Sequence, residues 1–470
     1  MMEIMVVIFI LGYIFIALEH RVGIDKAAIA LLTGGILWIL YIMISPLSVQ
    51  TVFPVHFGEF LADNSAVKLL PIIEQCRSYI VDVHVIESLG EISETLFFLM
   101  GAMTIVELVD VHGGFYIITD RITTKNKKTL LILIAIITFF MSAILDNLTT
   151  SIVMIMMVRK IVPNYKERWV YGSMIIIAAN SCGAWSPIGD VTTIMLWIKG
   201  KITTGPVVSR LFIPSLISMI IPMLLATKML KGEVADSSRK AVGHISTILS
   251  EKERLILSSL GVLALIMVPF FKYFTHLPPF IGVLTGLSVL WVYTEIIYSR
   301  KKSSETLKHR VTRVLKKVDT TTILFFLGIL LAVNALQGTG VLNTMGALLE
   351  EKVHNIYLIN ITIGLLSAIV DNVPLVAVAM GMYPLADASM IAAASDPMFI
   401  QTFVQDGSFW LFLAYCAGVG GSLLIIGSAA GVVVMGIEKI SFNWYLKNFS
   451  LLALAGYLSG AAAFALMDLL

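Results

Sequence analysis

Long apolar runs separated by short polar segments dominate the pattern of hydrophobic and polar positions along this chain. A bilayer core about 30 Å thick requires about 20 apolar residues of helix, so a chain built from such runs is expected to cross a membrane repeatedly. We therefore predict an all-α polytopic membrane protein. The runs cover residues 4–18, 27–45, 95–109, 129–158, 169–198, 211–229, 254–271, 279–298, 321–337, 355–383, 409–437 and 447–468.

Two of these runs, 129–158 and 355–383, are too long for one straight crossing. Each carries an Asp-Asn pair in its middle, which begins at Asp146 in the first run and at Asp371 in the second. We expect each run to enter the membrane and return on the same side, as a re-entrant hairpin with its Asp-Asn pair near the tip.

The positions of lysine and arginine predict the side of each hairpin, because cytoplasmic loops retain basic residues. Basic residues flank run 129–158 at both ends, whereas no Lys or Arg occurs from Val353 to Ile437. The first hairpin is therefore expected on the cytoplasmic side and the second on the external side. Two basic clusters are expected in cytoplasmic loops: Lys228, Lys231, Arg239, Lys240, Lys252 and Arg254, and Arg300, Lys301, Lys302, Lys308, Arg310, Arg313, Lys316 and Lys317.

The remaining spans alternate between the two sides of the membrane. Both termini are then external, as is stretch 46–93, where we expect short interfacial helices; Lys199 and Lys201 are exceptions to the rule, in an external loop. The predicted organisation is scaffold helices with an external segment (1–93), a first repeat (94–229), a cytoplasmic linker (230–253), scaffold helices (254–298), a basic cytoplasmic loop (299–320) and a second repeat (321–470).

Composition strengthens the membrane prediction. The chain has 58% hydrophobic and only 14% charged residues, whereas soluble domains carry roughly a quarter charged residues. Run 4–18 lacks a basic flank and a small-residue cleavage site, so we expect a retained helix rather than a signal peptide. Three distant cysteines, Cys76, Cys182 and Cys416, predict small apolar packing rather than a disulfide framework.

An internal repeat recurs at a distance of about 225–240 residues. The segments that begin at Leu96, Ser142 and Gly183 recur in the same order from Leu324, Ser367 and Gly421. Hairpins on opposite sides make the two halves inverted structural repeats, each with a re-entrant hairpin and an interrupted transmembrane helix. Inverted repeats with broken helices are typical of transporters whose site lies near mid-membrane.

Oxygen-bearing side chains gather at the predicted breaks. Carboxylate, amide and hydroxyl oxygens are the ligands that hard cations prefer, and intramembrane carboxylates are usually functional. Helix capping alone is the alternative role for each Asp-Asn pair. The predicted cation- and proton-binding residues are Asp146, Asn147, Thr149, Thr150, Asp190, Asp371 and Asn372, with Na⁺ held at Asp146, Asn147, Asp371 and Asn372.

The stretch from Asn180 to Thr193 lies inside an apolar run, and Gly183, Pro187 and Gly189 are expected to unwind it. Its counterpart, from Gly418 to Ser428, is rich in glycine but has no carboxylate; close helix packing is the alternative there. The predicted supporting polar residues are Ser142, Asn180, Ser186, Thr192, Thr193, Ser367, Ser422 and Ser428. Two further acids, Glu94 and Glu107, either line a proton path or occupy interfacial positions.

The stretches Ser142–Thr150, Asn180–Thr193, Ser367–Pro374 and Gly418–Ser428 resemble the NhaD-type sodium/proton antiporters of the ion transporter superfamily. The resemblance implies an inverted-repeat fold, usually a homodimer, that exchanges Na⁺ or Li⁺ for H⁺. The important polar positions of that family match Ser142, Asp146, Asn147, Asn180, Asp190, Thr192, Thr193, Ser367, Asp371, Asn372, Ser422 and Ser428.

We therefore predict a secondary antiporter, not an enzyme, that works by alternating access and by competition of Na⁺ and H⁺ for buried carboxylates. Carriers of dicarboxylates or of arsenite and antimonite in the same superfamily are the alternative, and an ion channel is a second. Related dicarboxylate carriers have Ser-Asn-Thr at the hairpin tips, where this chain has carboxylates. We expect no cofactor and no nucleic-acid partner, and a location in a bacterial inner membrane.

Overall fold

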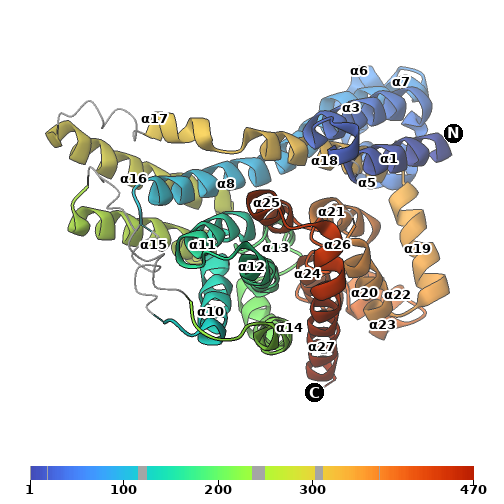
Figure 1. Ribbon diagram of the computed structural model, residues 1–470. Coiled ribbons are helices and arrows are strands. Elements are labelled where there is room, and N and C mark those ends of the chain that lie inside the picture. Colours follow the sequence, from blue (N-terminus) through green and yellow to red (C-terminus); the bar gives the residue numbers. More distant parts are fainter. Residues whose placement is uncertain are drawn as a thin grey trace. The chain divides into compact units, whose positions relative to one another are not determined.

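The computed structural model describes residues 2–17, 19–114, 124–234, 249–301, 311–369 and 371–469, and it contains α-helices but no strand within those ranges (Figure 1). Several predicted cytoplasmic basic residues lie outside the described residues: Arg239, Lys240, Lys302, Lys308 and Arg310. The predicted linker and basic loop are therefore described only at their edges.

Eight helical segments in the described ranges are long and apolar enough to cross a membrane. This confirms the prediction of an all-α polytopic membrane protein. The segments are α3 (Lys26–Ile44), Ile72–Val111, α10 (Lys127–Leu145), Thr204–Met229, α15 (Glu251–Thr275), α16 (Pro279–Lys301), α18 (Thr320–Gly338) and α27 (Ser450–Asp468).

One helix begins far earlier than the apolar run predicts. The helix predicted over 95–109 begins much earlier, since α7 (Ile72–Tyr79) continues through a π-helical turn (Ile80–His84) into α8 (Val85–Val111). Acidic residues along its first half interrupt the apolar pattern, so hydropathy does not reveal that half as part of the helix. Short helices do occupy the preceding stretch, as expected: α4 (Val49–Val52), α5 (Pro54–Asp63) and α6 (Ser65–Lys68).

The chain divides into two compact units, and α8 contributes to both. The first unit holds residues 1–96, 319–355 and 373–399. Within it α18 packs closely against α3, since a Cβ added at Gly34 would lie 2.7 Å from the carbonyl oxygen of Gly328. Small residues let two helix backbones approach in this way.

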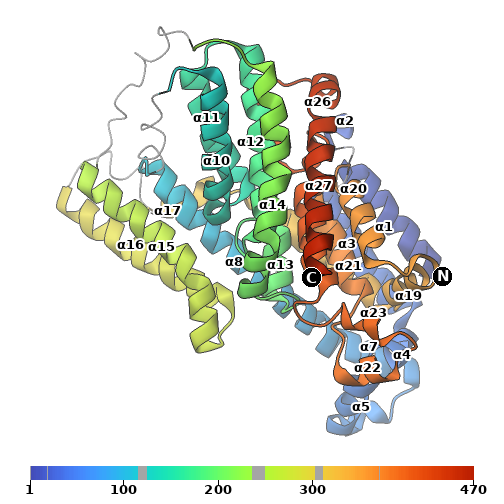
Figure 2. The same ribbon diagram turned by 90° about the horizontal axis from the view of Figure 1, so that it is seen from below.

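The second unit holds residues 97–318, 356–372 and 400–470. Its centre is α12 (Tyr165–Trp185), in which every side chain from Val170 to Ala184 is buried. Figure 2 shows α10, α11, α12 and α14 side by side, and α24 and α25 also contact α12. The remaining bounds are α11 (Asn147–Ile161), α13 (Val191–Ile198), α14 (Thr204–Ala226), α20 (Ile356–Leu366), α24 (Ser408–Gly420), α25 (Ala429–Glu438) and α26 (Phe442–Asn448).

Both long apolar runs are interrupted at their Asp-Asn pairs. In the first run α10 ends at Leu145 and α11 begins at Asn147; in the second, α20 ends at Leu366 and α21 (Asn372–Met382) begins at Asn372. The boundary between the two compact units falls directly after Asn372. The return of each run to its own side of a membrane, and the inversion of the repeats, stay predictions.

The three cysteines are buried, with free thiols, as expected for small apolar packing. Cys182 lies within α12 and Cys416 within α24, two helices that contact each other. Thus both belong to the apolar interior of the second unit.

Candidate cation-binding site

The first site residue, Asp146, separates α10 from α11. Its φ of 83° is a backbone conformation that residues other than glycine seldom adopt, and the helix is broken there. Its carboxylate caps α11: Oδ1 accepts a hydrogen bond from the Thr149 amide at 2.8 Å, and Oδ2 accepts one from the Thr149 hydroxyl at 3.0 Å. The negative charge is thus fixed at a helix N-terminus, where unpaired amides carry partial positive charge.

Asp190 plays the same capping part in the interrupted helix. Residues 186–190 are not helical, and α13 begins directly after Asp190. Its Oδ1 accepts from the Val191 amide at 2.9 Å, and its Oδ2 accepts from the Thr192 hydroxyl at 2.5 Å. The stretch between α12 and α13 is therefore unwound, with a carboxylate at the break; its crossing of a membrane stays a prediction.

Gly183 has a structural role that differs from the predicted one. It does not break the helix, because α12 continues to Trp185. Instead it makes room for Asp190, since a Cβ at position 183 would lie 2.6 Å from the Asp190 Cβ. Any larger residue at this position would push the carboxylate out of its place.

Asn147 joins the two breaks. Its side-chain nitrogen donates to Asp190 Oδ1 at 3.0 Å and to Asn180 Oδ1 at 3.1 Å. The tip of α11, the middle of α12 and the start of α13 are thereby held in one network.

Asn180 extends this network to the second half of the chain. Its nitrogen donates to Ser428 Oγ at 2.8 Å and to Ser422 Oγ at 3.0 Å. Ser428 caps α25, with its Oγ accepting from the Gly431 amide. The position aligned with Asp190 in the sequence repeat therefore also caps a helix start, with a hydroxyl in place of the carboxylate. Ser428 accepts from the amide three residues on, whereas Asp190 accepts from the next amide.

The two aligned serines make equivalent contacts. Ser142 Oγ donates to the carbonyl of Ala179 in α12 at 3.0 Å. Ser367 Oγ lies 2.9 Å from the carbonyl of Ala417 in α24 and 2.7 Å from Asn372 Oδ1, with one proton to donate. Both serines thus attach a break to a neighbouring helix, in agreement with the repeat predicted from the sequence.

The glycines before the two capping residues also correspond. A Cβ at Gly189 would lie 2.8 Å from the carbonyl oxygen of Ser142, and a Cβ at Gly427 would lie 2.7 Å from that of Ala368. Each glycine lets an unwound segment pass directly over the backbone beside one of the two Asp-Asn breaks.

The three aspartates lie near one another without forming a single cluster. Asp190 is within electrostatic range of both Asp146 and Asp371. Among the described residues no group of three or more His, Cys, Asp and Glu side chains is close enough to hold a metal ion. Repulsion between neighbouring carboxylates favours binding a cation or a proton between them.

The other predicted hydroxyl residues differ in whether they form a hydrogen bond within the described residues. Thr193 donates to the carbonyl of Gly183 at 2.9 Å, and Ser186 donates to that of Ala143 at 2.6 Å. Thr150 Oγ1 is buried and meets no hydrogen-bond partner among the described residues. A buried hydroxyl without a partner is costly, so Thr150 fits a role as an oxygen ligand better than the other two.

A family comparison identifies the class of protein. Residues 4–404 match the family model described as "Citrate transporter". The chain belongs to this family.

Several relatives of the chain carry antiporter names. The chain is 41% identical over 460 residues to "Sodium/proton antiporter 1" of Arabidopsis thaliana, covering 98% of this chain and 71% of that protein. It is 38% identical to "Sodium/proton antiporter 2" of the same plant, covering 97% of each. It is 28% identical to "Na(+)/H(+) antiporter NhaD" of Vibrio cholerae, covering 94% of this chain and 86% of that one.

Two acids predicted for a proton path in this family member do not join the network. Glu107 pairs with Lys317 at 3.5 Å. Glu94 lies on the same helix, in the other compact unit. Neither makes a described hydrogen bond to the residues around Asp190.

Sequence reasoning did not find two residues that support the site. Tyr445 donates to the carbonyl of Ser422 at 2.7 Å, and Ser218 donates to Ser181 Oγ at 2.9 Å. Both come from continuous helices, α14 and α26, that contain no carboxylate of their own. A buried hydroxyl in an apolar helix was the only signal, and many such residues bond only to their own helix.

Proposed function

We propose that this chain exchanges Na⁺ for H⁺ across a membrane by alternating access. The observation that carries the proposal is the placement of Asp146 and Asp190 at helix starts, joined through Asn147 and surrounded by buried hydroxyl and amide oxygens. Such a set of oxygens suits a hard cation. The antiporter names of the relatives agree with this chemistry.

The proposed coupling is competition for the carboxylates. Burial favours the protonated, neutral form of an aspartate, and a bound cation favours the charged form. Asp146 and Asp371 would hold protons in one state and share Na⁺ in the other, with Asp190 coupled to both. Because the carboxylates interact, they titrate as a set rather than singly.

The residues around them would keep the site assembled. Asn147 and Asn180 bridge the breaks, Thr150 offers an uncommitted hydroxyl, and Ser142 and Ser367 attach the two tips to neighbouring helices. In the proposed cycle the two hairpins and broken helices move together relative to a scaffold and expose the site to each side in turn.

Transport of citrate is the second candidate, because the family model has that description. The aspartates argue against it, since a tricarboxylate would meet like charge at Asp146, Asp190 and Asp371. A citrate site would instead need donors and cations at the breaks. Among the described site residues, the side chains that face Asp190 are amide and hydroxyl groups.

Three finer features belong to the same proposal. Li⁺ would replace Na⁺, the chain would form a homodimer, and the membrane would be a bacterial inner membrane. Relatives carry the antiporter name in both bacteria and a plant, so a fluorescent fusion in the source cell tests the location. Light scattering of the purified protein–detergent complex tests the dimer.

Proteoliposomes loaded with a pH dye test the exchange. With a proton gradient imposed, addition of Na⁺ or Li⁺ is expected to dissipate it, and citrate is expected to have no effect. Asp146→Asn and Asp371→Asn are expected to abolish the response, while Asp387→Asn, at an exposed residue of a loop, preserves it. A response to citrate with none to Na⁺ or Li⁺ would refute the proposal.

A further inference from the structure

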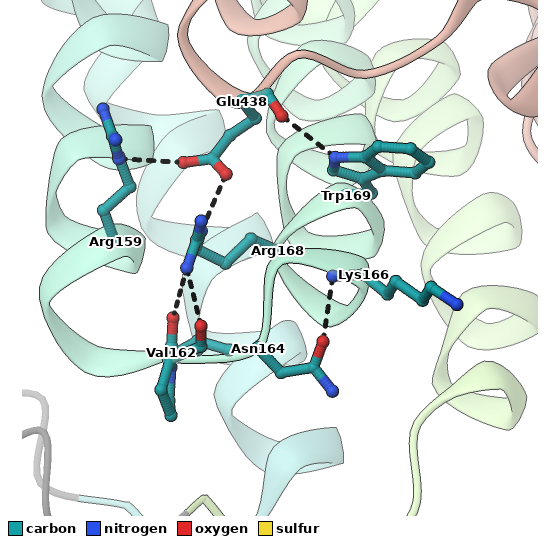
Figure 3. A network of polar contacts seen from close by, with 8 residues as sticks. Arg159, Val162, Asn164, Lys166, Arg168, Trp169 and Glu438 are labelled. Carbon is teal, nitrogen blue, oxygen red and sulfur yellow. Dashed lines mark hydrogen bonds and ion pairs between the residues drawn. The ribbon is translucent and has the colours of Figure 1, made fainter.

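A buried carboxylate lies far from the proposed cation site, at the end of α25. The side chain of Glu438 is 1% exposed and forms ion pairs with two arginines (Figure 3). Arg168 Nε lies 2.7 Å from Oε2, and Arg159 Nε lies 3.3 Å from Oε1. The backbone carbonyl of Glu438 also accepts from Trp169 Nε1 at 3.0 Å.

These contacts join the ends of three different helices. Arg159 is in the last turn of α11, Arg168 is in the first turn of α12, and Glu438 is the last residue of α25. Arg168 also donates to the carbonyls of Val162 and Pro163, in the turn that connects α11 to α12.

The same three helices meet again at the cation site. There α11 contributes Asn147, α12 contributes Asn180, and α25 starts at its capping residue Ser428. With a rise of 1.5 Å per residue, about 15–18 Å of helix separates the two networks along each of the three. Each helix is thus held at both ends, by neutral hydrogen bonds at the site and by ion pairs at the other end.

This arrangement controls how far one helix can slide along another. Asn147, Asn180 and Ser428 stay within hydrogen-bond distance only if the three helices keep their relative positions along their axes. A buried carboxylate that loses one of its cationic partners is strongly destabilised, so Glu438 resists such sliding. The partial negative charges at the ends of α11 and α25 also favour the arginines in this place.

We infer that Glu438, through Arg159 and Arg168, is a positioning residue that sets the register of Asn147, Asn180 and Ser428 and thereby the Na⁺ affinity of the site. The part about Na⁺ rests on the proposed function. The part about register does not, and the two can be tested apart.

The test of affinity is the Glu438→Gln variant of the full chain in proteoliposomes. The apparent KM for Na⁺ is expected to rise at least fivefold, with a maximal rate per folded transporter within twofold of the parent. Glu438→Asp, which keeps the charge, is expected to restore most of the affinity. Asp468→Asn is the matched control: it neutralises a carboxylate in α27 that pairs with Arg210 and also accepts from Tyr357 and Ser408, and it should leave KM unchanged.

The test of register is hydrogen–deuterium exchange in detergent without Na⁺. Amides at the start of α25 and around Asp146 are expected to exchange faster in Glu438→Gln and at the parent rate in Asp468→Asn. Faster exchange in a protein that moves no Na⁺ would support the register inference while the proposed function fails. Unchanged exchange and a KM within twofold of the parent would overturn the inference, whatever the yield of the variant.

A milder variant serves where Glu438→Gln does not fold. Arg159 is 46% exposed, so Arg159→Gln removes one ion pair and leaves the one with Arg168. The expected rise in KM is two- to threefold, with faster exchange at the start of α25. A parent-like KM and exchange rate in this variant would equally overturn the inference.

Discussion

Asn147 donates a hydrogen bond from its side-chain amide to Asp190 Oδ1 over 3.0 Å. The two residues belong to different broken elements, the tip of α11 and the start of α13. A neutral donor from one element therefore stabilises the charge of the other. Displacement of either break would change the environment of the Asp190 carboxylate.

Loss of this donor is expected to weaken cation binding. In Asn147→Ala, Asp190 Oδ1 keeps only its bond from the Val191 amide, and Asn180 Oδ1 loses its partner. Hydrogen bonds to charged groups contribute about 1.5–3 kcal/mol, so the apparent KM for Na⁺ should rise about tenfold or more. Na⁺ titrations of dye-loaded proteoliposomes measure this. Asn64→Ala, which removes an exposed hydrogen bond to the carbonyl of Phe60 in the first compact unit, should leave KM unchanged.

Neutralisation of Asp190 is expected to alter the competition with protons. Asp190→Asn keeps the shape of the side chain but removes one carboxylate that can exchange a proton for Na⁺. The apparent KM for Na⁺ should rise, and its dependence on pH should become shallower by roughly one proton. KM measured from pH 6 to 9 checks this. A KM that depends on pH as steeply as in the parent would exclude Asp190 from the coupled set.

The two close-approach glycines are expected to be intolerant of alanine. A Cβ at Gly189 would lie 2.8 Å from the carbonyl oxygen of Ser142, and one at Gly427 would lie 2.7 Å from that of Ala368. Overpacking of this kind costs about 1–3 kcal/mol. Gly189→Ala and Gly427→Ala should each melt several degrees below the parent in detergent. Gly35→Ala is the control, because an added Cβ there meets nothing within 4 Å. A melting temperature equal to that of the control would contradict the close contact between each glycine and the facing carbonyl oxygen.

A buried lysine in the loop between α13 and α14 predicts a pH-dependent stability. Burial, with a smaller effect of the nearby Lys199, lowers the pKa of the Lys201 ammonium from 10.5 to about 8, and the ammonium lies 4.2 Å from the centre of the Trp410 ring. Between pH 8 and 10.5 the unfolded chain binds more protons at this residue than the folded chain. The free energy of unfolding therefore rises with pH in that window, and the cost of burying the charge is fully present below pH 8.

Replacement of Lys201 by an uncharged residue should remove the free-energy cost of burying the ammonium. Lys201→Met is expected to be more stable than the parent at pH 7, by up to about 3 kcal/mol, and the difference should shrink as the pH approaches 10. Thermal unfolding in detergent at pH 7, 8.5 and 10 measures it. Lys166→Met, at an exposed position, should leave the profile unchanged. A stability difference between Lys201→Met and the parent that grows with pH would contradict this prediction.

Much of the architecture follows from the sequence because helix formation in a membrane is a local requirement. In a bilayer every backbone polar group must be satisfied within its own segment, so apolar length predicts the spans, and a carboxylate within such a run marks a break. The breaks at Asp146 and Asp190 could be predicted in this way. The first half of the long helix Ile72–Val111 could not, because acidic residues interrupt its apolar pattern.

The contacts between breaks depend on the tertiary structure. Sequence spacing could not show that Asn147 donates to Asp190, that Gly183 makes room for that carboxylate, or that Glu438 pairs with Arg159 and Arg168. These partners lie tens to hundreds of residues apart and meet only when the helices pack. The sequence by itself determined which polar residues interrupt the apolar runs. The packing of α11, α12 and α25 decided which of them meet, because a hydrogen bond depends on tenths of an ångström that no local pattern contains.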